Sequence, residues 1–316
     1  MNIEPRRAGE LCQLIEDNIS RVIIGKEDVI RKLLIALSAG GHILLEDVPG
    51  IGKTTLVSAL ARSLTLDFNR IQFTPDVMPS DVTGYNMYNP ATAAFEFHPG
   101  VIMTQLLLAD EINRTSPKTQ SALLEAMQEN QVTVDGKTYE LMQPFMVLAT
   151  QNPIEQVGTY TLPEAQLDRF MLKVTLGYPD LSEEMAILDR YSEDNPLADL
   201  QPVASGNDIL WLKEQARYVY VSDAIKRYIS ILSAKTREHP ELELGISPRA
   251  SLMLMQVAKS EALLSGRDYV LPDDVQKMII PCWSHRLIVK PEGRLKQQEP
   301  DTILGQIMRE VRVPER

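Results

Sequence analysis

The sequence predicts an α/β fold, in which a parallel sheet with helices on its faces is followed by an all-helical domain. Three observations favour this fold. Apolar runs of strand length alternate with helical segments as far as about residue 178, which is typical of parallel sheets. A glycine-rich loop joins one apolar run to a helix. Beyond Tyr178 and Pro179 nearly every segment has helical periodicity. We therefore divide the chain into residues 1–178 and 179–316.

Composition places the chain among globular proteins, since 44% of its 316 residues are hydrophobic and 24% are charged. The net charge of −11 disfavours long-range attraction to polyanions. Cys12 and Cys282 lie far apart, so free thiols in a reducing compartment are expected. No stretch approaches the ~20 uncharged apolar residues of a membrane span, and the N-terminus lacks an apolar signal core. We therefore expect a cytoplasmic protein without an integral membrane segment.

The elements of the first part follow from the spacing of apolar residues. Leucines and isoleucines recur at helical intervals in the N-terminal segments, and short apolar runs bounded by polar residues predict buried strands. The predicted helices are 5–20, 26–39, 53–64 and 117–129. The predicted strands are 42–47, 70–73, 101–109, 144–150 and 173–176.

Two insertions interrupt this alternation. Residues 74–100 are rich in Pro, Gly, Asn and Thr, with short apolar pieces between them. Residues 130–142 alternate polar and apolar side chains around Asp135 and Gly136. An Asp-Gly pair between alternating segments is a strong signal for a β-hairpin.

The second part reads as helices with recognisable start signals. Asp180 and Glu183 have the spacing of a capping box. Ser247 is a suitable N-cap because Pro248 follows at the first helical position. The other predicted helices are about 207–219, 222–238 and 272–285, and Gly266 ends the helix that starts at 248. The Pro-rich, charged tail after Arg286 gives no clear prediction.

The loop EDVPGIGKTT, residues 46–55, has the features of a phosphate-binding loop between a strand and a helix. Its glycines let backbone N–H groups face a β-phosphate, and the helix N-terminus favours an anion. Lys53 can reach the β- and γ-phosphates of ATP, and Thr54 can bind Mg²⁺. The predicted nucleotide contacts here are Pro49, Gly50, Ile51, Gly52, Lys53, Thr54 and Thr55. Asp47 departs from the usual glycine at that position. The alternative is a plain strand-to-helix turn.

The run LLLADE, residues 106–111, ends an apolar strand in two carboxylates. Ligands of open α/β folds bind at this edge of the sheet. Asp110 would hold Mg²⁺, and Glu111 would act as the general base for the attacking water. A solvated strand end is the alternative for these acids.

Four further polar residues are candidates for the γ-phosphate. Asn152 follows the apolar run FMVLAT and could bind that phosphate or the lytic water, or it could simply form a turn before Pro153. Arg169 could reach a neighbouring subunit's γ-phosphate, where an arginine stabilises transition-state charge. Arg249 could couple the helical domain to hydrolysis, and Arg114 could lie at a subunit interface. Surface ion pairs are the alternative for the arginines.

Four segments together carry a family resemblance: EDVPGIGKTT, LLLADEINRTSPKTQSALLEAMQE, VLATQNPIEQVGTYTLPEAQLDRF and GISPRA. They occur in the order and spacing of the MoxR family of AAA+ ATPases, which the chain resembles over about residues 5–285. The resemblance implies a P-loop AAA+ αβα core with a helical lid. Residues 72–100 would be the insertion within the second core helix, and 130–142 the hairpin before the first sensor.

The resemblance also implies roles for single residues. Asn152 would be the first sensor, Arg169 the arginine finger and Arg249 the second sensor, acting on its own subunit or on a neighbour. Ile24 and Gly25 would line the adenine pocket. The family implies ATP, Mg²⁺, a homo-oligomeric ring, commonly a hexamer, and a chaperone role with a von Willebrand factor A-type partner.

Two other functions compete with a protein-remodelling ATPase. A small-molecule kinase shares the phosphate loop but would lack Arg169 and the helical lid. A nucleic-acid motor needs several cations to grip a phosphate backbone. No Lys or Arg occurs between Arg70 and Arg114, whereas Asp76, Asp81 and Glu96 do. We therefore expect a protein client and no nucleic acid.

Overall fold

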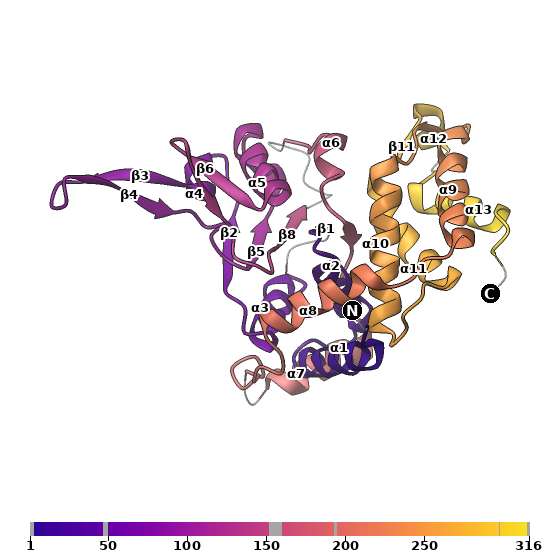
Figure 1. Ribbon diagram of the computed structural model, residues 1–316, viewed down its shortest axis with the longest axis horizontal. Coiled ribbons are helices and arrows are strands. Elements are labelled where there is room, and N and C mark those ends of the chain that lie inside the picture. Colours follow the sequence, from indigo (N-terminus) through magenta and orange to yellow (C-terminus); the bar gives the residue numbers. More distant parts are fainter. Residues whose placement is uncertain (1–2, 47–49, 152–159, 193–194, 297, 315–316) are drawn as a thin grey trace.

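The computed structural model describes residues 3–46, 50–151, 160–192, 195–296 and 298–314. Its centre is a five-stranded parallel sheet with the strand order β2-β5-β8-β1-β9 (Figure 1). The strands are β1 Ile43–Glu46, β2 Phe68–Gln72, β5 Leu106–Asp110, β8 Met146–Gln151 and β9 Leu172–Val174. The predicted class, a parallel-sheet α/β core followed by a helical lid, is confirmed.

The register brings the carboxyl ends of the strands to one edge. Gln72 pairs with Asp110, Ala109 with Ala149, and Glu46 with Gln151. The strand predicted at 101–109 is shorter than expected, because β5 starts only at Leu106, where the partner strand β2 becomes available for pairing.

Alternate residues of the strands face two separate apolar clusters. Leu106 and Leu108 join one cluster, while Leu107 and Ala109 join the other. The first cluster contains helices α1 Pro5–Ser20, α2 Glu27–Ala39 and α3 Lys53–Ser63. The second contains α5 Pro117–Glu129. Helices therefore cover both faces of the sheet.

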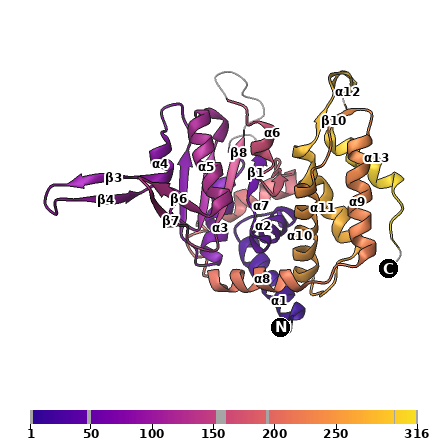
Figure 2. The same ribbon diagram turned by 45° about the horizontal axis from the view of Figure 1, so that its top comes forward.

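Both insertions form hairpins. The first contains α4 Pro79–Thr83, β3 Gly84–Asn89 and β4 Ala94–Pro99, and its β3–β4 hairpin projects from the body of the molecule (Figures 1 and 2). The second is β6 Gln131–Val134 with β7 Lys137–Glu140. Its turn is Asp135-Gly136, and both residues have positive φ. Phe97 of β4 stacks on Tyr139 of β7, with ring centroids 3.9 Å apart.

The part after β9 is mainly helical. Its helices are α7 Leu181–Tyr191, α8 Gly206–Tyr218, α9 Asp223–Glu238, α10 Pro248–Leu264, α11 Pro272–Trp283, α12 Pro291–Leu295 and α13 Pro300–Glu310. The 3-10 turn η2 Ser284–Arg286 follows α11, whereas the short segments α6 Glu164–Leu167 and η1 Ile112–Arg114 belong to the part before β9. A small antiparallel pair, β10 Leu242–Leu244 and β11 Ile288–Val289, lies among the helices and is missing from the sequence prediction.

Helices α8 and α10 pack against α2, and the apolar cluster of α1–α3 continues into the helical part. Arg31 of α2 lies in this contact. Its Nε donates to Glu261 Oε2 at 2.9 Å, and its other nitrogens donate to the Leu264 carbonyl and to Ser265 Oγ of the α10 end. The boundary at residue 178 stays a prediction, since the apolar core does not break there.

Candidate functional site

The phosphate loop meets the first turn of α3. Gly50 and Gly52 have φ of 86° and 90°, a conformation that glycine adopts without strain. Gly52 is the N-cap of α3, so Lys53 and Thr54 stand in its first turn, where backbone N–H groups remain without helical acceptors. Pro49 and the departure at Asp47 lie outside the described residues. The geometry of the described part fits an anion at the start of α3.

A cleft of about 400 Å³ opens beside this loop. One wall is the segment after α1, including Val22 and Ile24, and the opposite wall is α7 through Ile187 and Tyr191. The floor includes Gly50, Ile51, Gly52 and Thr55 of the loop and of α3. Apolar walls next to a phosphate loop suit a flat purine base. The structure thus brings Ile24 together with the loop residues.

Gly25 fixes how closely α7 approaches the cleft. Its φ is 68°, and a Cβ at this position would collide with the carboxylate of Glu183. That carboxylate receives Lys26 Nζ at 3.4 Å and the Asp180 amide at 2.9 Å. The predicted capping box of Asp180 and Glu183 is confirmed. The Lys26–Glu183 ion pair joins the start of α7 to the segment that follows α1.

The two carboxylates stand at the end of β5. Asp110 is 6% exposed. Its Oδ2 accepts from Arg70 Nε at 2.7 Å, and its Oδ1 accepts from Thr150 Oγ1 at 3.3 Å. Thr150 Oγ1 also accepts from the Glu111 amide at 2.9 Å. One hydroxyl on β8 therefore contacts the Asp110 carboxylate and the Glu111 backbone.

Glu111 is in the left-handed region with φ of 56°. Non-glycine residues rarely adopt this conformation, and they concentrate at functional sites. Its Oε2 is buried and accepts no hydrogen bond from the described residues. Arg114 Nη1 lies 3.1 Å from that oxygen as an ion-pair partner. The structure therefore places Arg114 beside the candidate base.

Arg169 and Arg249 do not line the cleft of their own chain. Arg169 Nη1 donates to the Leu124 carbonyl of α5 at 2.6 Å and lines a different cavity with Glu125. Arg249, at the start of α10, is about half exposed, and its Nε is 3.9 Å from Asp168 Oδ2. Because Asp168 precedes Arg169 in the chain, the two arginines belong to one region of the surface. Asn152 lies outside the described residues.

Four residues of the site are missing from the sequence prediction. Arg70 and Thr150 hold the Asp110 carboxylate, while Asp168 and Arg286 connect the two parts of the chain. Arg286 Nε donates to Asp168 Oδ1 at 2.8 Å, and its Nη2 donates to the Phe170 carbonyl at 2.6 Å. Of these four, only Thr150 could have been found from the sequence, because it is a polar residue at the end of an apolar run.

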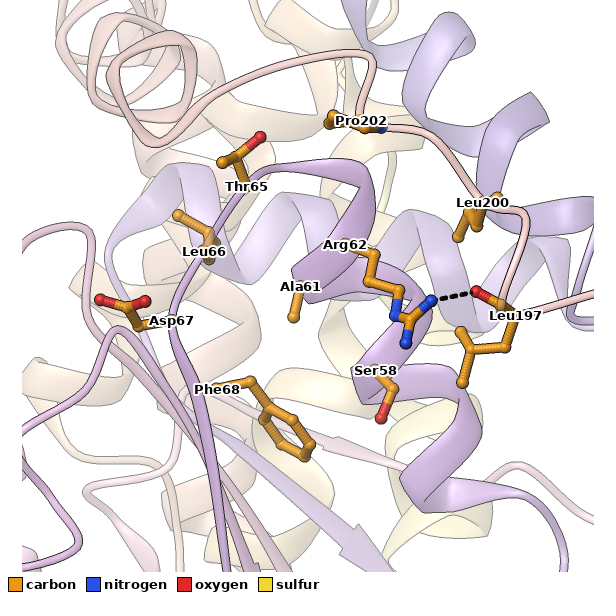
Figure 3. Close-up of a pocket in the computed structure, with 10 residues that line it drawn as sticks. All are labelled: Ser58, Ala61, Arg62, Thr65, Leu66, Asp67, Phe68, Leu197, Leu200 and Pro202. Atoms are coloured by element: carbon orange, nitrogen blue, oxygen red, sulfur yellow. Dashed lines mark hydrogen bonds between the residues drawn. The ribbon is translucent and has the colours of Figure 1, made fainter.

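A second cavity, of about 540 Å³, lies away from this site (Figure 3). Ser58 and Arg62 of α3 line it together with Phe68. Arg62 Nη1 donates to the Leu197 carbonyl at 2.5 Å, which ties the loop before α8 to the end of α3. Phe68 is the first residue of β2, so this cavity is at the amino edge of the sheet, opposite the phosphate loop. It is not part of the nucleotide site.

The described residues contain no group of three or more His, Cys, Asp or Glu side chains that could hold a metal ion. Cys12 and Cys282 are buried free thiols, and burial raises the pKa of Cys282 to about 11. No helix in the described ranges combines the length and apolar character needed to cross a bilayer.

Two family models match the chain. Residues 42–172 match the ATPase family associated with various cellular activities (AAA), and residues 234–307 match the AAA lid domain. An uncharacterized protein of Bacillus subtilis (strain 168), YeaC, is 52% identical over 94% of this chain and 93% of its own length. Chaperone MoxR1 of Mycobacterium tuberculosis is 40% identical over 94% of this chain and 81% of its own length.

A solved structure agrees with these relatives. The crystal structure of a proposed ATPase from Cytophaga hutchinsonii has a TM-score of 0.92 and 41% identity, covering 98% of this chain and 97% of its own. The parallel sheet, the phosphate loop, the strand-end carboxylates and the lid define a nucleotide-binding AAA+ ATPase. Within that class, the chain belongs to the MoxR family. The resemblance predicted from the sequence is confirmed.

Proposed function

We propose that this ATPase works with Mg²⁺ and uses ATP hydrolysis to remodel or mature a protein client. The observation that carries the hydrolytic part is the convergence of three elements at one sheet edge. The first turn of α3 offers Lys53 and Thr54, β5 ends in Asp110 and Glu111, and β8 supplies Thr150 between the two acids. This is where ligands of open α/β folds bind.

The donor set fits a magnesium ion. A threonine hydroxyl and a carboxylate are hard oxygen ligands, which Mg²⁺ prefers. Thr54 and Asp110 would hold the ion, directly or through water. Arg70, which is 48% exposed, keeps the Asp110 carboxylate in place from the solvent side. When bound, Mg²⁺ supplies charge neutralisation at the β- and γ-phosphates.

Glu111 is the candidate base because contacts hold both its backbone and its side chain. Thr150 accepts a hydrogen bond from the Glu111 amide. The buried Oε2 accepts no hydrogen bond from the described residues, so a water molecule can donate to it. Arg114 lies beside it, with Nη1 3.1 Å from that oxygen. The Asn152 side chain, the first sensor according to the resemblance, would bind the γ-phosphate or that water.

The positions of Arg169 and Arg249 support action on a neighbouring subunit. Both belong to the region around Asp168, and neither lines the cleft next to the phosphate loop of its own chain. In a head-to-tail ring, one surface region of each subunit faces the nucleotide cleft of the next. We extend the proposal to a ring, commonly a hexamer in the family, and to a von Willebrand factor A-type partner.

Two observations support a protein client: the similarity to a chaperone and the aromatic surface of the β3–β4 hairpin. Chaperone MoxR1 is 40% identical to this chain. The β3–β4 hairpin presents Tyr85, Tyr88 and Phe95 to solvent, with exposed fractions of 47%, 51% and 73%. No Lys or Arg lies between Arg70 and Arg114 in the sequence. An exposed aromatic surface without cations fits an apolar polypeptide better than a phosphate backbone.

The substitution Glu111→Gln tests the hydrolytic proposal. Turnover should fall by at least ~100-fold, because general-base catalysis contributes about that much. ATP affinity measured by calorimetry should stay within about threefold of the parent value. Turnover of the parent should also be lost when EDTA removes Mg²⁺ and return when Mg²⁺ is added. Hydrolysis by the variant at the parent rate would remove Glu111 from the mechanism.

The same variant tests the client. Held in ATP, Glu111→Gln should retain a polypeptide that the parent releases, and a Phe95→Ala, Tyr88→Ala double variant should retain less. Binding to duplex and single-stranded DNA is measured in parallel at two salt concentrations. Tight binding to DNA that weakens steeply with salt would contradict the protein-remodelling proposal.

A further inference from the structure

The 3-10 turn η1 begins at the candidate base. Glu111 is the N-cap of this turn and has a φ of 56°, a backbone conformation that non-glycine residues disfavour. Such a conformation persists only where surrounding contacts hold it. Thr150 supplies one contact, because it accepts from the Glu111 amide. The contacts on the C-terminal side of Glu111 therefore decide how firmly the rest of the turn is held.

Gln120 of α5 supplies a contact on that side. It is 1% exposed, although glutamine side chains are mostly found at protein surfaces. Its Nε2 donates to the Ile112 carbonyl and to the Tyr160 carbonyl, at 3.1 Å in each case. A carboxamide has two N–H donors, so both are used here. Because both partners are acceptors, only the nitrogen end of the side chain can face them.

The segment at Tyr160 is itself fixed in place. The Tyr160 amide donates to the Asn113 carbonyl of η1 at 2.6 Å. Further along the same segment, Arg169 Nη1 donates to the Leu124 carbonyl, which lies one helical turn after Gln120 on α5. Helix α5 packs into the apolar cluster on one face of the sheet. Gln120 therefore joins η1 to a packed helix and to a segment that is anchored on the same helix.

Loss of the Gln120 amide would remove a donor from a buried carbonyl. Ile112 is fully buried, and a buried carbonyl that loses a hydrogen bond carries a desolvation cost. The turn can reduce that cost by shifting its backbone toward another donor. Because Ile112 follows Glu111 directly, such a shift would also displace the candidate base.

We propose that Gln120 is a positioning residue for ATP hydrolysis, because its amide holds the turn that places Glu111 near the attacking water. The inference rests on the proposed role of Glu111 as the general base. Gln120 is absent from the described residues that line the cleft beside the phosphate loop. Its loss should therefore change turnover rather than nucleotide affinity. A displacement of about 1 Å at a catalytic group can cost about 100-fold in rate.

Turnover and ATP affinity of Gln120→Met test the proposal. Methionine has a similar length but no N–H group, so kcat should fall by about 10-fold to 100-fold, while ATP affinity measured by calorimetry stays within about threefold of the parent value. Asn18→Leu is the matched control. Asn18 is 3% exposed, and its Nδ2 also donates to two acceptors, Ser63 Oγ and the Gln201 carbonyl. Equal kcat losses in the two variants would overturn the proposal.

Hydrogen exchange without nucleotide tests the contact independently of the base. Amides of η1 should exchange at least ~10-fold faster in Gln120→Met than in the parent, because local opening becomes easier, and at the parent rate in Asn18→Leu. Parent-like exchange of η1 in Gln120→Met, or parent-like kcat, would overturn the proposal. A wrong assignment of the base would instead appear as parent-like turnover in Glu111→Gln. If Gln120→Met does not fold, Gln120→Asn, whose amide is one methylene shorter, is measured with the same expectations.

A double variant shows whether Gln120 and Thr150 act on the same turn. Residues that share one structural unit have non-additive effects. The kcat loss of Thr150→Val combined with Gln120→Met should therefore be at least ~3-fold smaller than the product of the two single losses. A combined loss equal to that product would show that the two side chains act separately, contrary to the proposal.

Discussion

At the residue scale, Thr150 connects the two acidic residues of the site. A single hydroxyl accepts from the Glu111 amide and donates to Asp110. The Glu111 backbone is in an unfavourable conformation, so an external contact is needed to hold it there. The roles of Asp110 and Glu111 thus depend on a neighbouring strand as well as on their own.

We expect Thr150→Val to separate positioning from binding. The buried Glu111 amide loses its acceptor, which should lower the free energy of unfolding by about 1–3 kcal/mol. A displaced base should reduce kcat by about 10-fold to 100-fold, while ATP affinity changes little. Thr150→Ser keeps the hydroxyl and should restore most of the kcat. Equal kcat values for Thr150→Val and the parent would show that the hydroxyl has no positioning role.

The buried His42 makes the stability of the fold depend on pH. Its Nε2 donates to the Met127 carbonyl at 2.9 Å and its Nδ1 accepts from the Val147 amide at 3.0 Å, which requires a neutral ring. Burial lowers the pKa of His42 from 6.5 to about 4. The folded state therefore binds fewer protons than the unfolded state between these pH values. Its stabilising contribution is complete above pH 6.5 and is lost as the pH falls toward 4.

We expect the free energy of unfolding to fall by on the order of 3 kcal/mol through His42 as the pH falls across this window. Burial lowers the pKa of His285 as well, so this residue also makes the fold less stable as the pH falls. Urea denaturation from pH 7.5 to 4.5 measures the effect. His42→Gln should flatten the profile relative to the parent, whereas His98→Gln on the β3–β4 hairpin should not. A parent profile that does not change would contradict the buried neutral ring.

At the scale of elements, the contact between α2 and α10 depends on one cation. Arg31 is 22% exposed and bridges Glu16 of α1 and Glu261 of α10, and the Glu261 side chain is 4% exposed. Removing one partner of a buried ion pair leaves the other charge uncompensated. Lys277, which also reaches Glu261 at 3.2 Å, compensates only in part because it is 62% exposed.

We expect Arg31→Met to lower the free energy of unfolding by about 3 kcal/mol. Lys32→Met is the matched control, because Lys32 pairs with Asp28, whose side chain is 79% exposed, and should cost less than ~1 kcal/mol. Urea titration measures both. Similar losses in the two variants would show that Arg31 is an ordinary surface cation.

Features encoded in contiguous segments could be predicted from the sequence, whereas long-range contacts could not. Long helices and buried strands follow from local periodicity, and the phosphate loop and LLLADE are contiguous motifs. The β10–β11 pair is only two or three residues per strand, too short for a periodic signal. The partners of Arg70 and Arg286 lie 40 and 118 residues away in sequence. Such pairs are set by tertiary packing, which no local pattern encodes.

At the scale of the whole molecule, the proposed role of Arg169 predicts that hydrolysis depends on assembly. We expect Arg169→Ala to reduce turnover by about 10³-fold or more, the scale of the arginine-finger role proposed for it, while ATP binding is kept. Lys53→Ala should also be inactive, because it lacks the phosphate contact. Mixing the two should restore activity, since one subunit supplies an intact phosphate loop and the other an intact Arg169. No recovery in a demonstrated mixed assembly would place Arg169 in its own subunit's chemistry.

The Arg286 contacts have a mechanical consequence. This guanidinium is 4% exposed and binds Asp168, the Phe170 carbonyl and the Cys282 carbonyl, so it joins η2 to the segment that carries Arg169. Asp168 also faces Arg249. A tilt of the lid that moves Arg286 would therefore be transmitted to Asp168, which lies between Arg169 in the chain and Arg249 in space. Under the proposed function, the orientation of the lid would therefore set the positions of both arginines together.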